Sequence, residues 1–242
     1  PPLAFAPRPL RGVSLFPACP TGANTGPGQL PFPDTPLTII PRDPTPSVAR
    51  VAKSSSGHYL LVRDGEDGRL EYRLPLRAGV WDDLAVRWKE AGDAWVSVGL
   101  GGGLFFAGEN GGAPVRPTDE AVRVSSDGKS VTYEGRIACG ARASEVHLRF
   151  HLVGKSLVMD IQAEGGAIAE CRFGSTRGFA APRPVFLPYY TYGGYGDLSA
   201  RPALVVSGTP TAPLFFMAHI DWTQSNASEP FAESLRPDGT LA

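Results

Sequence analysis

The sequence predicts an all-β protein, a large antiparallel β-sandwich of about twelve strands. The chain has 242 residues with 29 glycines and 24 prolines, yet 42% of its residues are hydrophobic. That combination indicates many turns and short strands around a normal core, not disorder. Segments of alternating polar and apolar residues recur between turn residues, and no segment has the period of an amphipathic helix.

The first part of the chain differs in composition from the rest. Residues 1–46 hold 13 of the 24 prolines. Proline has no N–H for a sheet ladder, so we expect an extended segment over residues 1–47. Its apolar residues, among them Leu15, Phe16 and Ile39, favour packing on the core of a sandwich over residues 48–242. A flexible linker is the alternative.

Strands are predicted from His58 onward, where the alternating pattern begins. Asp127-Gly128 and Gly154-Lys155 each stand between two such segments, as hairpin turns do. The predicted strands cover residues 58–63, 69–74, 84–88, 95–100, 104–107, 121–125, 130–139, 145–152, 157–164, 168–173, 203–207 and 214–220.

Residues 145–152 give the clearest alternation in the chain. Val146, Leu148 and Phe150 share one face, which we expect in the core. His147 and His151 lie on the other face. Their spacing would suit a zinc site on a helix, but on a strand it separates them by about 13 Å. We therefore expect them on the solvent face and predict no shared metal.

Composition excludes several classes of protein. The net charge of -1 gives no reason to expect nucleic acid or an anionic membrane as a partner. No apolar run reaches the length of a membrane span. The three cysteines, Cys19, Cys139 and Cys171, allow one disulfide but no disulfide scaffold. No cofactor or metal is predicted.

The ends of the chain raise the question of a longer protein. The sequence opens Pro-Pro-Leu, without an initiator Met or a basic leader, so the residues do not give the compartment. A secreted or periplasmic location is the favoured interpretation. At the other end, the turn Pro237-Asp238-Gly239 leads into what resembles the start of another strand. We expect the natural protein to continue into a further domain.

The candidate site combines a tyrosine-rich loop with a polar cluster around one tryptophan. Tyrosine and tryptophan offer an apolar face with a polar tip, which suits a sugar ring or a neighbouring domain. A saccharide surface, a domain interface and plain packing all remain open. The candidate contact residues are Tyr189, Tyr190, Tyr192, Tyr195, Asp197, Asp221, Trp222, Ser225, Asn226 and Glu229.

Catalytic residues are not assignable from the sequence. Glycoside hydrolysis needs two carboxylates roughly 5–10 Å apart. The chain has many carboxylates, but spacing along a β-protein does not show which of them meet. No serine elbow and no Cys/His nucleophile pair is present. The phosphate-loop-like Gly154-Lys155-Ser156 lies in a hairpin turn and lacks the glycine that such a loop needs earlier in the chain.

Two strings carry a resemblance to a known family. They are Pro-Tyr-Tyr-Thr-Tyr-Gly at 188–193 and Asp-Trp-Thr-Gln-Ser-Asn at 221–226. Following a long antiparallel region, they resemble the N-terminal galactose-mutarotase-like β-supersandwich of large glycoside hydrolases, which precedes a catalytic barrel. The resemblance covers most of residues 48–230.

The resemblance implies a function. It implies a non-catalytic sandwich domain of a carbohydrate-active enzyme, which packs on a barrel domain and lends a loop to its active site. The catalytic carboxylates would then lie outside this chain. A stand-alone carbohydrate-binding module and a mutarotase-like or lyase-type enzyme are the alternatives. The catalytic motifs of a true mutarotase are not matched.

Overall fold

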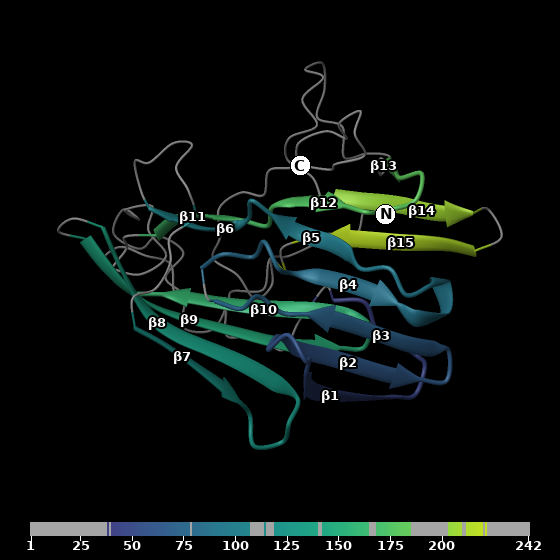
Figure 1. Cartoon of the computed structure of the whole chain (residues 1–242), viewed down its shortest axis with the longest axis horizontal. Helices are drawn as coiled ribbons and strands as arrows, with labels where there is room; N and C mark the ends of the chain where they lie inside the picture. Colours follow the sequence, from purple (N-terminus) through teal and green to yellow (C-terminus); the bar gives the residue numbers. More distant parts are fainter. Residues whose placement is uncertain are drawn as a thin grey trace, which may run out of the picture.

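The computed structural model is built from antiparallel β-sheets, with one short 3₁₀ turn at Lys89–Ala91 as the helical element among the described residues. Figure 1 shows the strands stacked in layers. The structure describes residues 40–77, 79–106, 119–139, 142–164, 168–184, 203–209 and 212–219, together with Thr38, Pro114 and Asp221.

The largest sheet has six strands in the order β1-β2-β3-β4-β5-β12. Neighbouring strands follow one another along the chain, except that the last place is taken by β12. A two-residue turn at Glu66 and Asp67 joins β2 to β3. The strands are β1 Ser47–Lys53, β2 Tyr59–Gly65, β3 Gly68–Arg73, β4 Ala85–Trp88, β5 Val96–Leu100 and β12 Ser175–Arg177.

The second sheet is a four-stranded meander in the order β10-β9-β8-β7. The β7–β8 and β9–β10 hairpins turn at the two places that the sequence predicts, Asp127-Gly128 and Gly154-Lys155. Gly154 has a φ of 58°, which glycine adopts without strain. The strands are β7 Asp119–Val124, β8 Ser130–Cys139, β9 Arg142–Val153 and β10 Ser156–Ala163.

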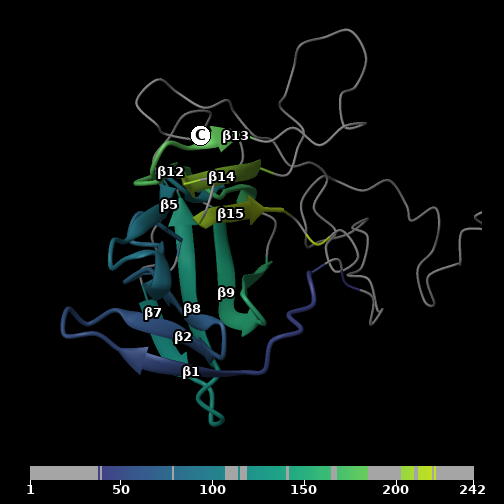
Figure 2. The same ribbon diagram turned by 90° about the vertical axis from the view of Figure 1, so that its right-hand side faces the viewer.

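Two smaller sheets complete the described structure. One pairs β6 with β11 and the other has the order β13-β14-β15. In both views the three-stranded sheet lies beside β5 and β12, on the side of the six-stranded sheet away from β1 (Figures 1 and 2). The strands are β6 Gly103–Phe106, β11 Ile168–Arg172, β13 Arg183–Pro184, β14 Ala203–Thr209 and β15 Ala212–Ala218.

The core lies between the six-stranded and four-stranded sheets. One continuous cluster of buried residues joins Leu61 and Leu70 of the first sheet to Leu148 and Phe150 of the second. Tyr133 meets Phe150 edge to face, with ring centroids 5.6 Å apart. The chain is therefore all-β with sheets packed face to face, as a β-sandwich is.

Aromatic side chains with polar tips tie the layers together at the rim of the core. Tyr72 Oη donates to the carbonyl of Lys155 at 2.7 Å, from the first sheet to the β9–β10 turn. Tyr133 Oη donates to the carbonyl of Pro75 at 2.6 Å, in the opposite direction. Each ring is buried while its hydroxyl is satisfied, so both contribute area without an unpaired polar atom.

The alternation predicted over residues 145–152 is confirmed. Val146, Leu148 and Phe150 are each 1% exposed or less, while His147 points to the other face. All twelve predicted strands overlap strands of the structure. Three strands were not predicted, namely β1, β12 and β13. The described residues contain fifteen strands, compared with the expected count of about twelve. Of the three additional strands, β12 and β13 have three and two residues, and β1 has seven.

The three-stranded sheet joins the rest through the inward face of β15. Phe216 packs against the main core cluster and meets the ring of Phe179 at a centroid distance of 5.5 Å. Ser207 of β14 donates from Oγ to the carbonyl of Ala180 at 2.8 Å. The inward face of this sheet therefore packs on the rest of the structure, and its other face points away from the core.

Candidate functional site

Asp221 is the predicted site residue that the structure describes. The other nine, Tyr189, Tyr190, Tyr192, Tyr195, Asp197, Trp222, Ser225, Asn226 and Glu229, lie outside the described residues. The hydroxyl of Thr38 donates to Asp221 Oδ2 at 2.5 Å. The same Thr38 oxygen accepts the N–H of Ile40 at 3.1 Å. The proline-rich segment therefore reaches the start of the predicted polar cluster.

The strand that leads to Asp221 exposes an apolar face. Phe215 of β15 is 71% exposed and Met217 is 40% exposed. Val206 of β14 lies opposite Phe215 in the register and so shares this face. The two strands, each of seven residues, read ALVVSGT and APLFFMA and contain no charged residue. Strand faces that stand in water ordinarily carry polar residues, so this face is unusual.

A buried ion cluster holds the segment that precedes β1. The Arg63 side chain is 1% exposed and the Asp43 side chain is 6% exposed. Arg63 Nε donates to Asp43 Oδ2 at 2.8 Å. Arg63 Nη1 donates to Asp67 Oδ1 at 2.8 Å. Asp43 Oδ1 accepts the N–H of Thr45 at 3.1 Å.

A second cation reaches the same cluster from the other sheet. Lys155, in the β9–β10 turn, lies with Nζ 2.5 Å from Asp67 Oδ2 and 5.4 Å from the ring centre of Trp88. Hydrogen bonds from Lys155 and then Arg63 lower the pKa of Asp67 to about 2. The four charged residues Arg63, Asp43, Asp67 and Lys155, called the latch below, connect the proline-rich segment to both sheets.

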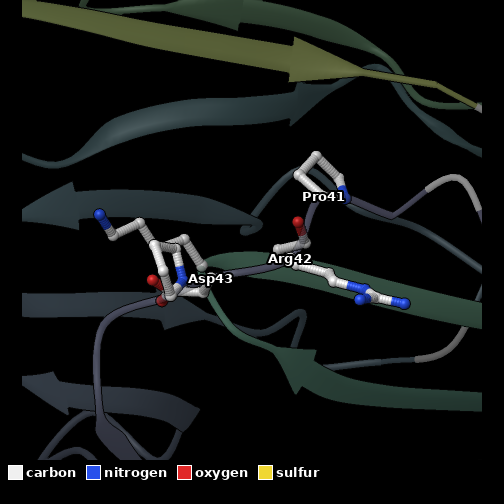
Figure 3. A pocket seen from close by; sticks show the side chains of 6 residues that line it. Pro41, Arg42 and Asp43 are labelled. Atoms are coloured by element: carbon white, nitrogen blue, oxygen red, sulfur yellow. The ribbon is translucent and has the colours of Figure 1, made fainter.

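A small cavity lies beside the latch. Figure 3 shows Pro41, Arg42 and Asp43 along one side of it. Its volume is about 140 Å³, and Pro44, Lys155 and Ser156 complete the lining. The Lys155 ammonium beside this cavity pairs with Asp67, and the Asp43 carboxylate pairs with Arg63, so both of these charges are neutralised within the chain.

The outer face of the six-stranded sheet carries a different charged network. Glu71 is 1% exposed although it points away from the core. Its two oxygens accept from Arg69 Nε at 2.7 Å and Arg87 Nε at 2.5 Å. Burial alone raises the pKa of Glu71, but the hydrogen bonds from Arg87 and Arg69 outweigh it and lower the pKa. Arg87 also stacks on Trp95, 4.4 Å from the ring centre.

The two predicted solvent-face histidines lie next to carboxylates on the outer face of the four-stranded sheet. His147 Nδ1 is 4.0 Å from Glu134 Oε1, and His151 Nδ1 is 3.5 Å from Asp160 Oδ2. Burial lowers the pKa of His151, against the charge of Asp160, which raises it. Within the described ranges, no three His, Cys, Asp or Glu side chains are grouped as metal ligands.

A serine–histidine–aspartate set lies at the β1–β2 turn. Ser56 Oγ and His58 Nδ1 are 3.0 Å apart, and His58 Nε2 is 3.9 Å from Asp83 Oδ1. Ser54 Oγ also accepts the N–H of His58 at 3.1 Å. The serine and histidine are two residues apart in one turn, and the aspartate is beyond hydrogen-bond range. This arrangement stabilises the turn and lacks the geometry of a nucleophile with its base.

Cys171 contains a free thiol. Burial raises its pKa to about 12, so it stays protonated and unreactive at neutral pH. The Cys19 and Cys139 side chains lie outside the described residues. Nor does the described part of the chain contain a helix with the length and apolar character of a membrane span.

The latch and the Glu71 network were both missed by the sequence analysis. Alternation along 58–63 places Arg63 on the same face as Tyr59 and Leu61, and this is the one available signal. An arginine on a core face requires a buried acid. Its partner Asp43 comes from the proline-rich segment, twenty residues earlier. No local pattern points to that pairing.

Comparisons of this chain with protein-family models, with characterised proteins and with solved structures found no match.

Proposed function

We propose that this chain is a non-catalytic β-sandwich domain of a glycoside hydrolase, which packs against a barrel domain and contributes to the rim of its active site. The finer form of the fold, a galactose-mutarotase-like supersandwich, belongs to the same proposal. One observation supports the packing surface more than any other. The outer face of β14 and β15 has no charged residue and exposes Phe215 and Met217. Aromatic residues and methionine are enriched at interfaces, where charged residues are depleted.

The position of this face along the chain adds to the argument. Asp221, the first residue of the predicted polar cluster, follows Ala218 at the end of β15 by three positions. The uncharged face and the aromatic-polar cluster are therefore neighbours in sequence. An apolar patch bordered by polar and aromatic residues is the composition of a domain interface. The carbohydrate part of the proposal rests on the resemblance of the strings at 188–193 and 221–226.

Activity assays separate this proposal from its alternatives. We expect the chain alone to hydrolyse no aryl glycoside or polysaccharide, while the complete product of its gene does. Hydrolysis or sugar epimerisation by the chain alone would support a mutarotase-like or lyase-type enzyme. Binding of the chain to a glycan array, lost on Trp222→Ala with an unchanged circular dichroism spectrum, would support a carbohydrate-binding module. A gene that encodes no further domain would contradict the proposal.

A matched pair of variants tests the interface in the complete gene product. Phe215→Ser with Met217→Ser removes the apolar side chains of the β15 face. We expect lower hydrolytic activity and separate unfolding of the two domains. Val48→Ser is the control, because Val48 is 65% exposed on β1, away from this face. Equal activity in both variants would contradict the proposed packing.

A further inference from the structure

Arg63 lies at a buried position, where a cation loses its favourable hydration. In the β2–β3 register it lies opposite Leu70, and it shares a face with Leu61, which is fully buried. An unpaired guanidinium there would lose its hydration without compensation. Asp43 and Asp67 provide that compensation, but in different ways. Asp67 belongs to the turn beside Arg63, whereas Asp43 is brought from the proline-rich segment.

Asp43 does not provide a hydrogen-bond acceptor for each of the two Arg63 nitrogens that face it. Arg63 Nε and Nη2 both lie against the same oxygen, Oδ2, at 2.8 and 2.7 Å. The contact of Nη2 is an ion pair without hydrogen-bond geometry, so this buried nitrogen has no acceptor among the described residues. The other oxygen of Asp43 is turned away to the N–H of Thr45. A free carboxylate instead meets the edge of a guanidinium with both oxygens.

A small cavity adjoins the Asp43 carboxylate. Its volume is about 140 Å³, and Lys155 and Ser156 also line it. The segment 41–44 that closes it contains two prolines, which donate no backbone hydrogen bonds. Gly154 lets Asp43 approach closely, because a Cβ at this position would collide with the Asp43 Cβ. Asp43 is thus the polar anchor of a short segment that lies against the β9–β10 turn.

We propose that the Nε/Nη2 edge of Arg63 is a carboxylate-binding site which the chain closes with its own Asp43, and that a small carboxylate ligand binds when residues 41–44 lift away. The ligand carboxylate takes the position of the Asp43 carboxylate and satisfies both nitrogens. Lys155 and Ser156 face the remainder of the ligand. This site is independent of the function proposed above, since it lies at the latch and involves neither β15 nor the residues around Trp222.

Formate is the probe, because it is the smallest carboxylate. Melting temperatures are measured for the purified chain in formate and in chloride at equal ionic strength and pH 7. For Asp43→Ala, we expect the melting temperature in formate to be about 3–6 °C above that in chloride. This holds at a formate concentration ten times its dissociation constant. Asp64→Ala, which removes an exposed aspartate paired with Arg50, is the matched control and shows no difference.

The double variant Asp43→Ala/Arg63→Met identifies the binding group. Methionine replaces the buried cation with an apolar side chain, so this variant folds but has no site for formate. If Asp43→Ala alone is unfolded in chloride, formate restores its circular dichroism spectrum and chloride does not. A formate response that persists in the double variant, or no response in Asp43→Ala, overturns the site.

Hydrogen exchange in the unmodified chain tests the closing segment. The Thr45 amide is held by Asp43 Oδ1. A ligand that displaces Asp43 therefore speeds exchange at Thr45, and we expect a several-fold increase in saturating formate. The amide of Lys129, which is held by Asp127 Oδ1 in the β7–β8 turn, is the control and keeps its rate. An unchanged rate at Thr45 overturns the proposed opening.

Discussion

Two of the outer sheet faces of this molecule differ in charge. On the six-stranded sheet, one row across the strands reads Arg50, Val62, Glu71 and Arg87. On the three-stranded sheet, the outer face of β14–β15 has Val206 and Phe215 side by side, and neither strand contains a charged residue. Both faces point away from the core, so burial within this chain does not explain the difference.

The charged side chains on the six-stranded sheet neutralise and cover one another. Glu71 is buried by the arginines that neutralise it, and Arg87 in turn covers Trp95. Val62, which lies opposite Glu71 in the register, is fully buried on this outer face.

The uncharged face of β14–β15 leaves a large apolar side chain exposed. Phe215 is almost three-quarters exposed, with no long polar side chain among the residues opposite it in the register. A contact with another protein surface removes that area from water, at roughly 25 cal/mol per Å². An outer strand face can therefore be covered by its own arginines or by a partner. We interpret β14–β15 as the second case.

The largest effect is expected on the charged face. Glu71→Ala leaves Arg69 and Arg87 next to each other without their shared acid, and we expect a loss of about 2–3 kcal/mol in the free energy of unfolding. Urea denaturation measures this. Glu66→Ala, at the exposed turn between β2 and β3, is the matched control and stays within about 0.5 kcal/mol. A loss in Glu71→Ala no larger than in the control would show that the network contributes nothing.

A smaller effect concerns acid stability. The pKa of Glu71 is lower in the folded protein than its usual value, so the network contributes stability above that usual value, near 4.5. The contribution is lost as the pH falls through the folded pKa. We expect Glu71→Gln to be less stable than the unmodified chain at pH 7 and to lose less stability between pH 4.5 and 2. Denaturant midpoints across this range measure it, and parallel pH profiles would contradict the lowered pKa.

The smallest effect is expected on the uncharged face. Phe215→Ser with Met217→Ser should change the stability of the isolated chain by no more than about 0.5 kcal/mol per residue, because both side chains are exposed. The double variant should also bind less of a hydrophobic dye. Phe216→Ser is the control on the inward face and should cost roughly 2–3 kcal/mol. A large loss in the outward variant would mean that these side chains are packed within the chain.

The strand pattern was predictable because it is local. Alternation over 145–152 and the turn at Gly154-Lys155 predict the β9–β10 hairpin. They also predict that the hairpin face with Phe150 is the buried one. The hairpin at Asp127-Gly128 followed in the same way. Strand β1 was missed because it directly follows the proline-rich segment, and its alternation, with Val48 and Arg50 pointing outward, is weak.

The candidate site stays a prediction, since the structure describes one of its ten residues, Asp221. Composition alone indicates that residues 189–229 are unusual. Within that set, the structure describes the contact of Asp221 with Thr38. The ion clusters were not predictable, because they pair residues far apart in the chain. Lys155 meets Asp67 across the two sheets, and Asp43 meets Arg63 from outside the sandwich. Sequence spacing contains no information on such pairs.

Methionine oxidation shows whether the β14–β15 face is covered, because the chain has two methionines on different faces. Met217 is on the uncharged face, and Met159 packs against the core as an internal reference. Dilute hydrogen peroxide should oxidise Met217 much faster than Met159 in the isolated chain. In the complete gene product we expect Met217 to be protected to the level of Met159. Equal oxidation of Met217 in both proteins would contradict the account that β14–β15 forms an interface.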